Sequence, residues 1–262
     1  MYNFDYVKPG SVAEAITALQ SEDAVAMSGG QTLLPTMKAR LAQPSTIVDL
    51  SGMAELTGIT VDAGKVTIGG ATRHVAVETS SEVQSAFPAL AALAGGIGDP
   101  QVRNRGTIGG SVANNDPAAC YPSACLGTGA TIHTSTRTIA ADDFFQGMFD
   151  TALEEGELVT GVSFPIPSQA NYQKFVQPAS RFALVGVFVA KFDGGVRVAV
   201  TGASEEGVHR WTAAEAALSA NFSPDAVPDA PPAEGMIGDI HGSPEYRAHI
   251  VQVMTKRAVA AA

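Results

Sequence analysis

Several features that mark common protein classes are scarce in this sequence. Its 262 residues include only two cysteines, Cys120 and Cys125, which are too few to ligate an iron–sulfur cluster or a structural zinc ion within the chain. We interpret them as reduced thiols of a cytoplasmic protein. Basic residues are also few, with 16 Lys and Arg against 26 Asp and Glu. Because nucleic-acid-binding surfaces normally carry a basic field, that class of partner is disfavoured.

Long hydrophobic runs are absent as well. The longest, Phe182 to Ala190, is far too short to span a bilayer and is typical of a buried strand. The first residues, Met1 to Tyr6, show no basic region followed by an apolar one, so no signal peptide is evident. Apolar residues nevertheless make up 45% of the chain. We therefore expect a globular protein with a large core, no membrane span and more than one domain.

The familiar nucleotide and catalytic motifs are missing. Residues 96–101 (Gly-Ile-Gly-Asp-Pro-Gln) supply only the first two glycines of G-x-G-x-x-G, and no P-loop occurs. Neither H-E-x-x-H nor G-x-S-x-G is present. The five histidines are scattered, and we interpret His74 and His133 as surface or hydrogen-bonded structural residues. We expect no metal site and no catalytic side chain.

Two glycine-rich stretches stand out instead. They are residues 28–35 (Ser-Gly-Gly-Gln-Thr-Leu-Leu-Pro) and residues 106–117 (Gly-Thr-Ile-Gly-Gly-Ser-Val-Ala-Asn-Asn-Asp-Pro). Glycine adopts positive φ at low cost and lets the backbone come close to a ligand. Turns with several free N–H groups also bind anions. Basic residues flank both stretches: Lys38, Arg40, Arg103 and Arg105. We expect two loops that hold one phosphorylated cofactor, although a Gly-Gly pair alone is often only a tight turn.

The hydrophobic pattern gives a coarse order of elements. It predicts helices over 11–20, 33–41, 83–93 and 213–218 and from Ser243 onward. It predicts strands over 24–28, 46–50, 66–68, 130–134, 138–140, 158–164, 183–192 and 196–203. Ser11 to Glu14 form a capping box, and Asp193-Gly194 is a strong hairpin signal. The composition shifts near residues 168–170, where we place a domain boundary.

The two glycine-rich stretches, at this spacing, resemble those of the FAD-binding medium subunits of molybdenum hydroxylases, such as carbon monoxide dehydrogenase and xanthine dehydrogenase. Residues 28–35 resemble the first pyrophosphate loop of that family and residues 99–117 the second. The resemblance covers nearly the whole chain. It implies an α+β fold, with a PCMH-type FAD-binding fold in two α/β subdomains, 1–54 and 55–170. A C-terminal antiparallel sheet with helices would follow over 171–262.

The resemblance also implies a cofactor and partners. FAD would lie between the first two subdomains. It would take electrons from a small [2Fe–2S] subunit and pass them to an acceptor, while a large molybdopterin subunit oxidises the substrate. The complex would be a heterotrimer that dimerises. The chemistry would then belong to the cofactor, which agrees with the lack of a cysteine set and of acid–base residues in this chain.

Carried onto this sequence, the resemblance implies a set of cofactor-binding residues. Those for the pyrophosphate and ribityl groups would be Ser28, Gly29, Gly30, Gln31, Thr32, Leu33, Thr107, Ile108, Gly109, Gly110 and Ser111. Asn114 and Asp116 would add polar contacts, although Asp116-Pro117 is equally well explained as a turn. Leu158 would offer a backbone contact to the ring edge. Phe182 would stack on or gate the isoalloxazine, or else belong to the core.

Two positions depart from the family pattern. Relatives often have a carboxylate where this chain has Cys120. They also commonly show a Lys-Arg pair and an aspartate where this chain has residues 176–182. We still expect the chain to bind FAD, but these changes put the choice of electron acceptor in question. The alternatives are a stand-alone FAD-dependent oxidase and a non-catalytic assembly protein that has kept the fold.

Overall fold

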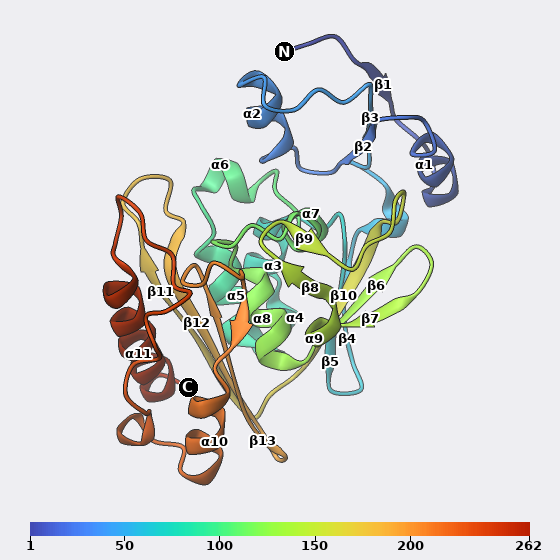
Figure 1. Ribbon diagram of the computed structural model, residues 1–262. Helices are drawn as coiled ribbons and strands as arrows, with labels where there is room; N and C mark the ends of the chain where they lie inside the picture. The colour runs from blue at the N-terminus through green and yellow to red at the C-terminus, as the bar shows by residue number, and fades with distance from the viewer.

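Three β-sheets give the chain its architecture, and the computed structural model describes all of residues 1–262 (Figure 1). The first sheet is parallel, whereas the second and third are antiparallel. In Figure 1 the first part of the chain, in blue, stands as a lobe above the other two parts. The predicted α+β fold is therefore confirmed.

The first lobe is a small α/β unit. Its sheet has the order β1-β3-β2. Its elements are β1 (Asp5–Val7), α1 (Val12–Ala18), β2 (Ala24–Met27), α2 (Leu33–Lys38), β3 (Thr46–Asp49) and the short 3₁₀ helix η1 (Ala54–Leu56). Helix α1 begins at the predicted cap, because the Ser11 side chain accepts the Glu14 N–H at 3.2 Å. The Glu14 carboxylate accepts the Gly10 N–H at 2.7 Å, so both side chains satisfy free amides.

The second sheet has the order β4-β5-β10-β6-β7. These strands are β4 (Ile59–Asp62), β5 (Lys65–Gly69), β10 (Val159–Pro165), β6 (Thr131–Thr134) and β7 (Thr138–Ala140). Between them the chain forms helices and a two-stranded ribbon: α3 (His74–Thr79), α4 (Ser81–Ala86), α5 (Pro88–Gly95), α6 (Pro100–Arg103), α7 (Ile108–Asn114), α8 (Tyr121–Thr128), α9 (Ala141–Phe144), β8 (Phe145–Gly147) and β9 (Asp150–Thr151). This sheet and its helices hold most of the largest hydrophobic core.

The third sheet has the order β11-β12-β13-β14. The elements are β11 (Gln169–Val176), β12 (Ala183–Phe192), β13 (Gly195–Thr201), β14 (His209–Arg210), α10 (Thr212–Ala220), the 3₁₀ helix η2 (Pro224–Ala226) and α11 (Pro244–Ala260). Figure 1 shows α10 and α11 on the side of this sheet that faces away from α5 and α8. The sheet is therefore covered by helices on both faces.

Strand β12 explains the longest apolar run of the sequence. Its side chains alternate between two cores: Phe188 and Ala190 pack in the core of the second sheet. Val187 and Val189 pack in the core beneath α10 and α11. A strand buried on both faces needs apolar residues at successive positions. The predicted hairpin at Asp193-Gly194 is confirmed, since β12 and β13 pair antiparallel around it.

Two expectations about helices are wrong. The helix predicted over 83–93 is broken at Phe87, whose φ of −146° and ψ of 68° are not helical, because a residue before proline is pushed out of the helical region. The stretch 106–117, expected to be a loop, is largely helix α7, with Thr107 as its N-cap. None of the helices combines the length and apolar character needed to cross a bilayer.

Candidate cofactor site

The two glycine-rich stretches meet in space. Thr107 Oγ1 donates a hydrogen bond to Ser28 Oγ at 3.0 Å. A Cβ added to Gly29 would lie 2.7 Å from Gly106 Cα, so the two backbones touch at a distance that only glycine allows. The end of β2 is thereby joined to the residues that begin α7.

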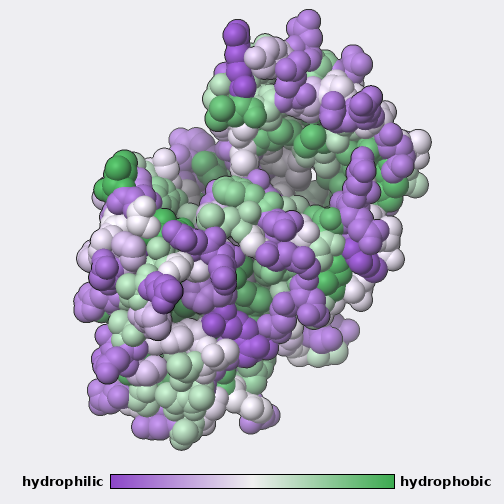
Figure 2. Space-filling model, in the orientation of Figure 1, coloured by the Kyte–Doolittle hydropathy of each residue, from purple (hydrophilic) through white to green (hydrophobic).

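A cavity of about 710 Å³ opens along this junction. Figure 2 shows the surface hollowed between the N-terminal lobe, at the top, and the rest of the molecule. The cavity lies within the size range of small-molecule and cofactor sites. The predicted residues that line it are Ser28, Gly29, Gly30, Gln31, Thr32, Leu33, Thr107, Gly110, Ser111, Asn114, Asp116 and Phe182. Ile108, Gly109 and Leu158 do not line it.

The first stretch provides free backbone amides. The N–H groups of residues 29–33 donate no hydrogen bond within the chain, and these residues are partly or fully exposed. Gly30 has a φ of 69°, in the left-handed region that glycine tolerates. Gln31 Nε2 donates to the Gly29 carbonyl oxygen at 3.1 Å, which braces the turn. Consecutive unpaired amides of this kind form a concave anion site.

The backbone N–H groups of the second stretch are hydrogen-bonded within the protein. The Gly109 N–H donates to the Gly70 carbonyl at 2.8 Å, and the Ser111 N–H donates to the Thr107 carbonyl at 3.0 Å. The Gly110 N–H donates to Thr107 Oγ1 at 3.3 Å. The second stretch therefore differs from the first, because it folds into a capped helix. It offers the cavity side chains, such as that of Ser111, rather than free N–H groups.

Gly109 and Ile108 pack inside the protein and do not line the cavity. A Cβ added to Gly109 would lie 2.6 Å from the Gly70 carbonyl oxygen. Ile108 is fully buried in the core of the second sheet. Neither glycine of the Gly109-Gly110 pair has positive φ, so no turn requires them, and close packing requires glycine only at position 109.

Helix α7 ends in a turn that the rest of the protein holds in place. Asn115 has a left-handed φ of 42°, and its Nδ2 donates to the carbonyls of Gly147 and Asp150 at 2.7 and 2.8 Å. Asp116 Oδ1 accepts the Ala118 N–H at 2.8 Å. The turn interpretation of Asp116 is thus confirmed, while the same residue also lines the cavity.

The third sheet anchors this turn from outside the cavity. Thr201 Oγ1 lies 2.8 Å from the carbonyl oxygens of both Pro117 and Ala119. The Gly202 N–H donates to the Pro117 carbonyl at 2.7 Å. No sequence motif marked Thr201 or Gly202, because the contact joins residues far apart in the chain.

The cations of the cavity are not the ones that flank the glycines in sequence. Lys174 and Arg181 line it and form no ion pair, whereas Asp116 is the one carboxylate among its lining residues. Arg103 instead pairs with Glu78 at 2.7 Å. The flanking residues Lys38, Arg40, Arg103 and Arg105 are all absent from the lining. The cavity is therefore locally positive in a chain of net charge −10.

Lys174 and Cys120 share one side of the cavity. Lys174 Nζ donates to the Gly96 carbonyl at 2.9 Å and lies 3.5 Å from Cys120 Sγ. Cys120 thus stands beside a cation. Its counterpart Cys125 is fully buried, and burial raises the pKa of the Cys125 thiol.

Phe182 belongs to the cavity wall. It lines the cavity, and its ring lies 5.5 Å from that of His241 in an edge-to-face arrangement. The two residues before it, Ser180 and Arg181, have φ values of 61° and 57°. Non-glycine residues in this region are uncommon and mark a strained connection between β11 and β12. The alternative that Phe182 is a core residue is not what the structure shows.

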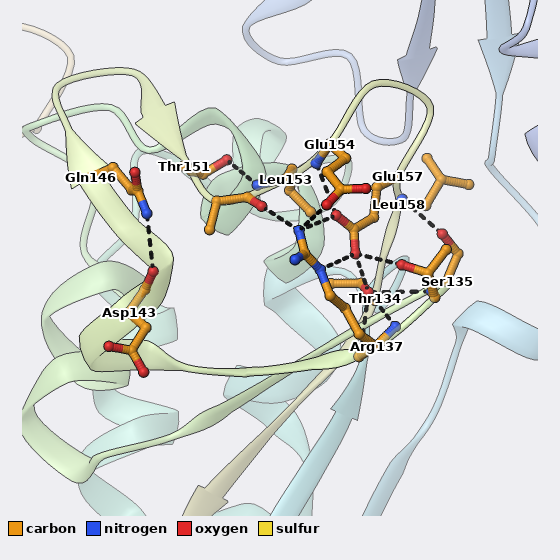
Figure 3. Close-up of polar contacts among 12 residues, drawn as sticks. Thr134, Ser135, Arg137, Asp143, Gln146, Thr151, Leu153, Glu154, Glu157 and Leu158 are labelled. Atoms are coloured by element: carbon orange, nitrogen blue, oxygen red, sulfur yellow. Dashed lines mark hydrogen bonds and ion pairs between the residues drawn. The ribbon is translucent and has the colours of Figure 1, made fainter.

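Leu158 sits away from the cavity, in a polar network that Figure 3 shows. Its N–H donates to Ser135 Oγ at 3.1 Å, and its carbonyl accepts the Ser135 N–H at 2.8 Å. Next to it, the Glu157 carboxylate accepts bonds from Arg137 Nη2 at 3.0 Å and Thr136 Oγ1 at 2.7 Å. The Leu158 backbone is already paired, so nothing in this geometry supports its predicted contact with a flavin ring.

The two histidines singled out in the sequence differ. His133 Nε2 lies 2.7 Å from Ser163 Oγ, which confirms a structural role. His74 is 5% exposed, lines the cavity and makes no side-chain hydrogen bond. Burial, with a smaller contribution from the charge of Arg103, lowers the pKa of His74 to about 4. His74 is thus neither a surface residue nor a hydrogen-bonded one.

Known proteins resemble this chain over nearly its whole length. Residues 2–167 match the family described as the FAD binding domain in molybdopterin dehydrogenase. The nicotine 6-hydroxylase medium subunit of Paenarthrobacter nicotinovorans is 35% identical, over 97% of this chain and 95% of the relative. The carbon monoxide dehydrogenase medium chain of Hydrogenophaga pseudoflava is 34% identical, over 99% and 96%.

A solved structure shows the same likeness over the whole fold. The cyanide-inactivated form of Cu,Mo-CO dehydrogenase matches with a TM-score of 0.89 and 31% identity, covering 99% of this chain and 97% of the other. The free amides of residues 29–33 and the nearby cations fit the anionic pyrophosphate of a dinucleotide. The chain belongs to the family of FAD-binding medium subunits of molybdenum hydroxylases and is similar to that of carbon monoxide dehydrogenase.

Proposed function

We propose that this chain is the electron-transfer subunit of a molybdenum hydroxylase complex. It passes electrons from the [2Fe–2S] clusters of a small partner subunit, through FAD, to an external acceptor. A large molybdopterin subunit oxidises the substrate, and the heterotrimer dimerises. The medium subunits it resembles are named for reactions as different as those of nicotine and carbon monoxide, which supports placing substrate choice in another chain.

The observation that carries the proposal is the run of unpaired amides at residues 29–33 beside a large cavity. Unpaired N–H groups in one turn favour a bound anion, because they donate without the desolvation cost of a side-chain charge. Lys174 and Arg181 add positive charge to the same space. These groups would hold the pyrophosphate and the other polar parts of FAD.

The remaining lining residues would orient the cofactor. Ser111 and Asn114 present a hydroxyl and an amide from α7, and Asp116 presents one carboxylate oxygen that has no partner in the chain. Phe182 would pack on the ring or restrict access to it. Bound FAD supplies the redox chemistry. The chain itself binds the cofactor, orients it and limits the access of water.

Cofactor loading and turnover of the isolated chain test this function. We expect the protein to bind one FAD per chain after incubation with the cofactor and gel filtration. The isolated flavoprotein should oxidise no organic substrate. A reduced [2Fe–2S] subunit of such a complex should reduce its flavin in stopped-flow experiments.

The alternatives predict other outcomes in the same experiment. A stand-alone oxidase would consume oxygen with an organic substrate and no partner. An assembly protein would stay colourless after incubation with FAD. Either result would overturn the proposed role.

A further inference from the structure

His74 is a buried titratable residue of the cavity that neither glycine-rich stretch contains. It begins helix α3, and its backbone N–H donates to the Gly106 carbonyl at 2.9 Å. A Cβ added to Gly106 would lie 2.7 Å from His74 Nε2 and 2.9 Å from its Cδ2. The imidazole is therefore packed against the residue that precedes Thr107, at the junction of the two stretches.

The two ring nitrogens of His74 have different surroundings. Nδ1 is fully buried and has no hydrogen-bond partner. Nε2 has no partner in the chain either, but it is not among the fully buried unpartnered atoms. The small exposed part of the residue faces the cavity that it lines. Nε2 is accordingly the nitrogen that a ligand in the cavity can reach.

Tyr121 packs against His74 and carries a hydroxyl that bears on its tautomer. Its ring lies 5.4 Å from that of His74 at an angle of 44°. Tyr121 Oη is also buried without a partner, and burial raises the Tyr121 pKa, so this hydroxyl keeps its proton. This hydroxyl makes no direct hydrogen bond to Nδ1, since both atoms lack a partner, but a protonated hydroxyl can donate to Nδ1 through one buried water. The proton of the neutral imidazole then resides on Nε2.

We propose that His74 is a further cofactor-binding residue, whose neutral imidazole donates a hydrogen bond from Nε2 to an acceptor oxygen of the dinucleotide, with Tyr121 as its positioning residue. The inference rests on the proposed function, because it takes FAD to be the occupant of the cavity. It differs from that proposal in its donor, since the groups assigned there are amides, hydroxyls and charged side chains but no imidazole.

Substitution of His74 by glutamine or asparagine distinguishes the roles of its two ring nitrogens. In His74→Gln the side-chain nitrogen reaches close to the position of Nε2, whereas in His74→Asn it reaches only that of Nδ1. We expect His74→Asn to weaken FAD binding about tenfold, the usual effect of losing one hydrogen bond, and His74→Gln to stay within about threefold of the natural protein. Equilibrium dialysis of the apoprotein with FAD measures both. Thermal unfolding without FAD verifies that each variant is folded.

Nitrogen NMR of the apoprotein gives a readout that does not involve FAD. We expect the Nε2–H tautomer, no titration of His74 between about pH 5 and 8, and a loss of tautomer preference in Tyr121→Phe. An Nδ1–H tautomer, or equal FAD affinity of the Asn and Gln variants, would overturn the inference. If the natural protein bound no FAD at all, the proposed function would fail as well, whereas normal binding by His74→Asn would remove only this inference.

Discussion

At the scale of single residues, adjacent glycines have separate tasks. Gly109 packs against the Gly70 backbone, whereas a Cβ at Gly110 would meet only Thr107 Oγ1, at 3.1 Å. Gly110 lines the cavity and Gly109 does not. The pair Gly-Gly in the sequence predicted a ligand-binding turn, but one glycine serves the protein interior and the other faces the cavity.

Alanine substitutions of these two glycines form a matched pair. We expect Gly109→Ala to lower the free energy of unfolding by about 1–3 kcal/mol, because the new methyl group overlaps a backbone that cannot move freely. Gly110→Ala should keep the stability, since alanine favours a helix over glycine, but weaken FAD binding severalfold. Urea unfolding and FAD titration measure the two effects. Equal stability of the two variants would contradict this assignment.

Glu157 is a single residue that makes the stability of the fold depend on pH. Its bonds to Arg137, Thr134 and Thr136 hold the pKa of this carboxyl at about 2, below the usual 4.5. The Glu157 side chain is 2% exposed, so this stabilisation is little screened. A depressed carboxyl pKa stabilises the fold above about pH 4.5, and that contribution is lost as the pH falls from there towards 2.

We expect Glu157→Gln to be less stable than the natural protein by about 2–3 kcal/mol at neutral pH. The difference should stay constant above about pH 5 and shrink as the pH is lowered below 4.5. Urea unfolding of both proteins over this range measures it. A difference that did not change with pH would show that the charge of Glu157 is not what stabilises the loop.

At the scale of elements, helix α7 explains how one stretch of sequence serves both packing and the cavity. Thr107 caps its start and Asn115 ends it in a left-handed conformation. The sequence showed the residue types that favour these ends, Thr and Asn. It did not show that a helix lies between them, because Ile-Gly-Gly-Ser has poor helix propensity and tertiary contacts stabilise it.

The link between β13 and the turn after α7 can be tested through Thr201. Thr201→Val removes the hydroxyl that contacts the Pro117 and Ala119 carbonyls. We expect a loss of about 1 kcal/mol in unfolding free energy and weaker FAD binding, because the Asp116 turn loosens. Thr201→Ser keeps the hydroxyl and should behave like the natural protein. Unchanged FAD affinity in the valine variant would indicate that the turn does not depend on Thr201.

At the scale of the whole molecule, charge is unevenly distributed. The chain is acidic overall, yet its cavity collects Lys174 and Arg181, from β11 and the connection that follows it. A local positive field is what an anionic cofactor requires, and it steers the cofactor in from solution. The acidic remainder of the surface does not abolish this field, because screening limits it to about 8–10 Å.

The salt dependence of FAD binding measures the positive field of the cavity. We expect Lys174→Met to weaken FAD binding about tenfold at low ionic strength and to make the affinity less sensitive to added salt. Lys38→Met removes the same charge from a residue that follows the first stretch but does not line the cavity. It should leave both quantities unchanged. Equal effects of the two substitutions would mean that net charge, and not the cavity, governs binding.

Much of the fold follows from local sequence. The strands over 183–192 and 196–203, the cap at Ser11 and the hairpin at Asp193-Gly194 were all predicted, because alternation, capping and turn chemistry act over a few neighbouring residues. The helix predicted over 83–93 is interrupted at Phe87, the residue before Pro88. The subdomain boundaries at 54 and 170 stay predictions, as do the individual cofactor contacts.

Local residue patterns were enough to identify the family, because the two glycine-rich stretches at this spacing are specific. They also indicated which first-stretch residues line the cavity. Only the tertiary structure decided which groups complete the site. Lys174, Arg181 and His74 reach the cavity from β11, the β11–β12 connection and α3, and Leu158 points elsewhere. Such placements depend on how sheets and helices pack over long sequence distances, and local residue patterns carry no record of that packing.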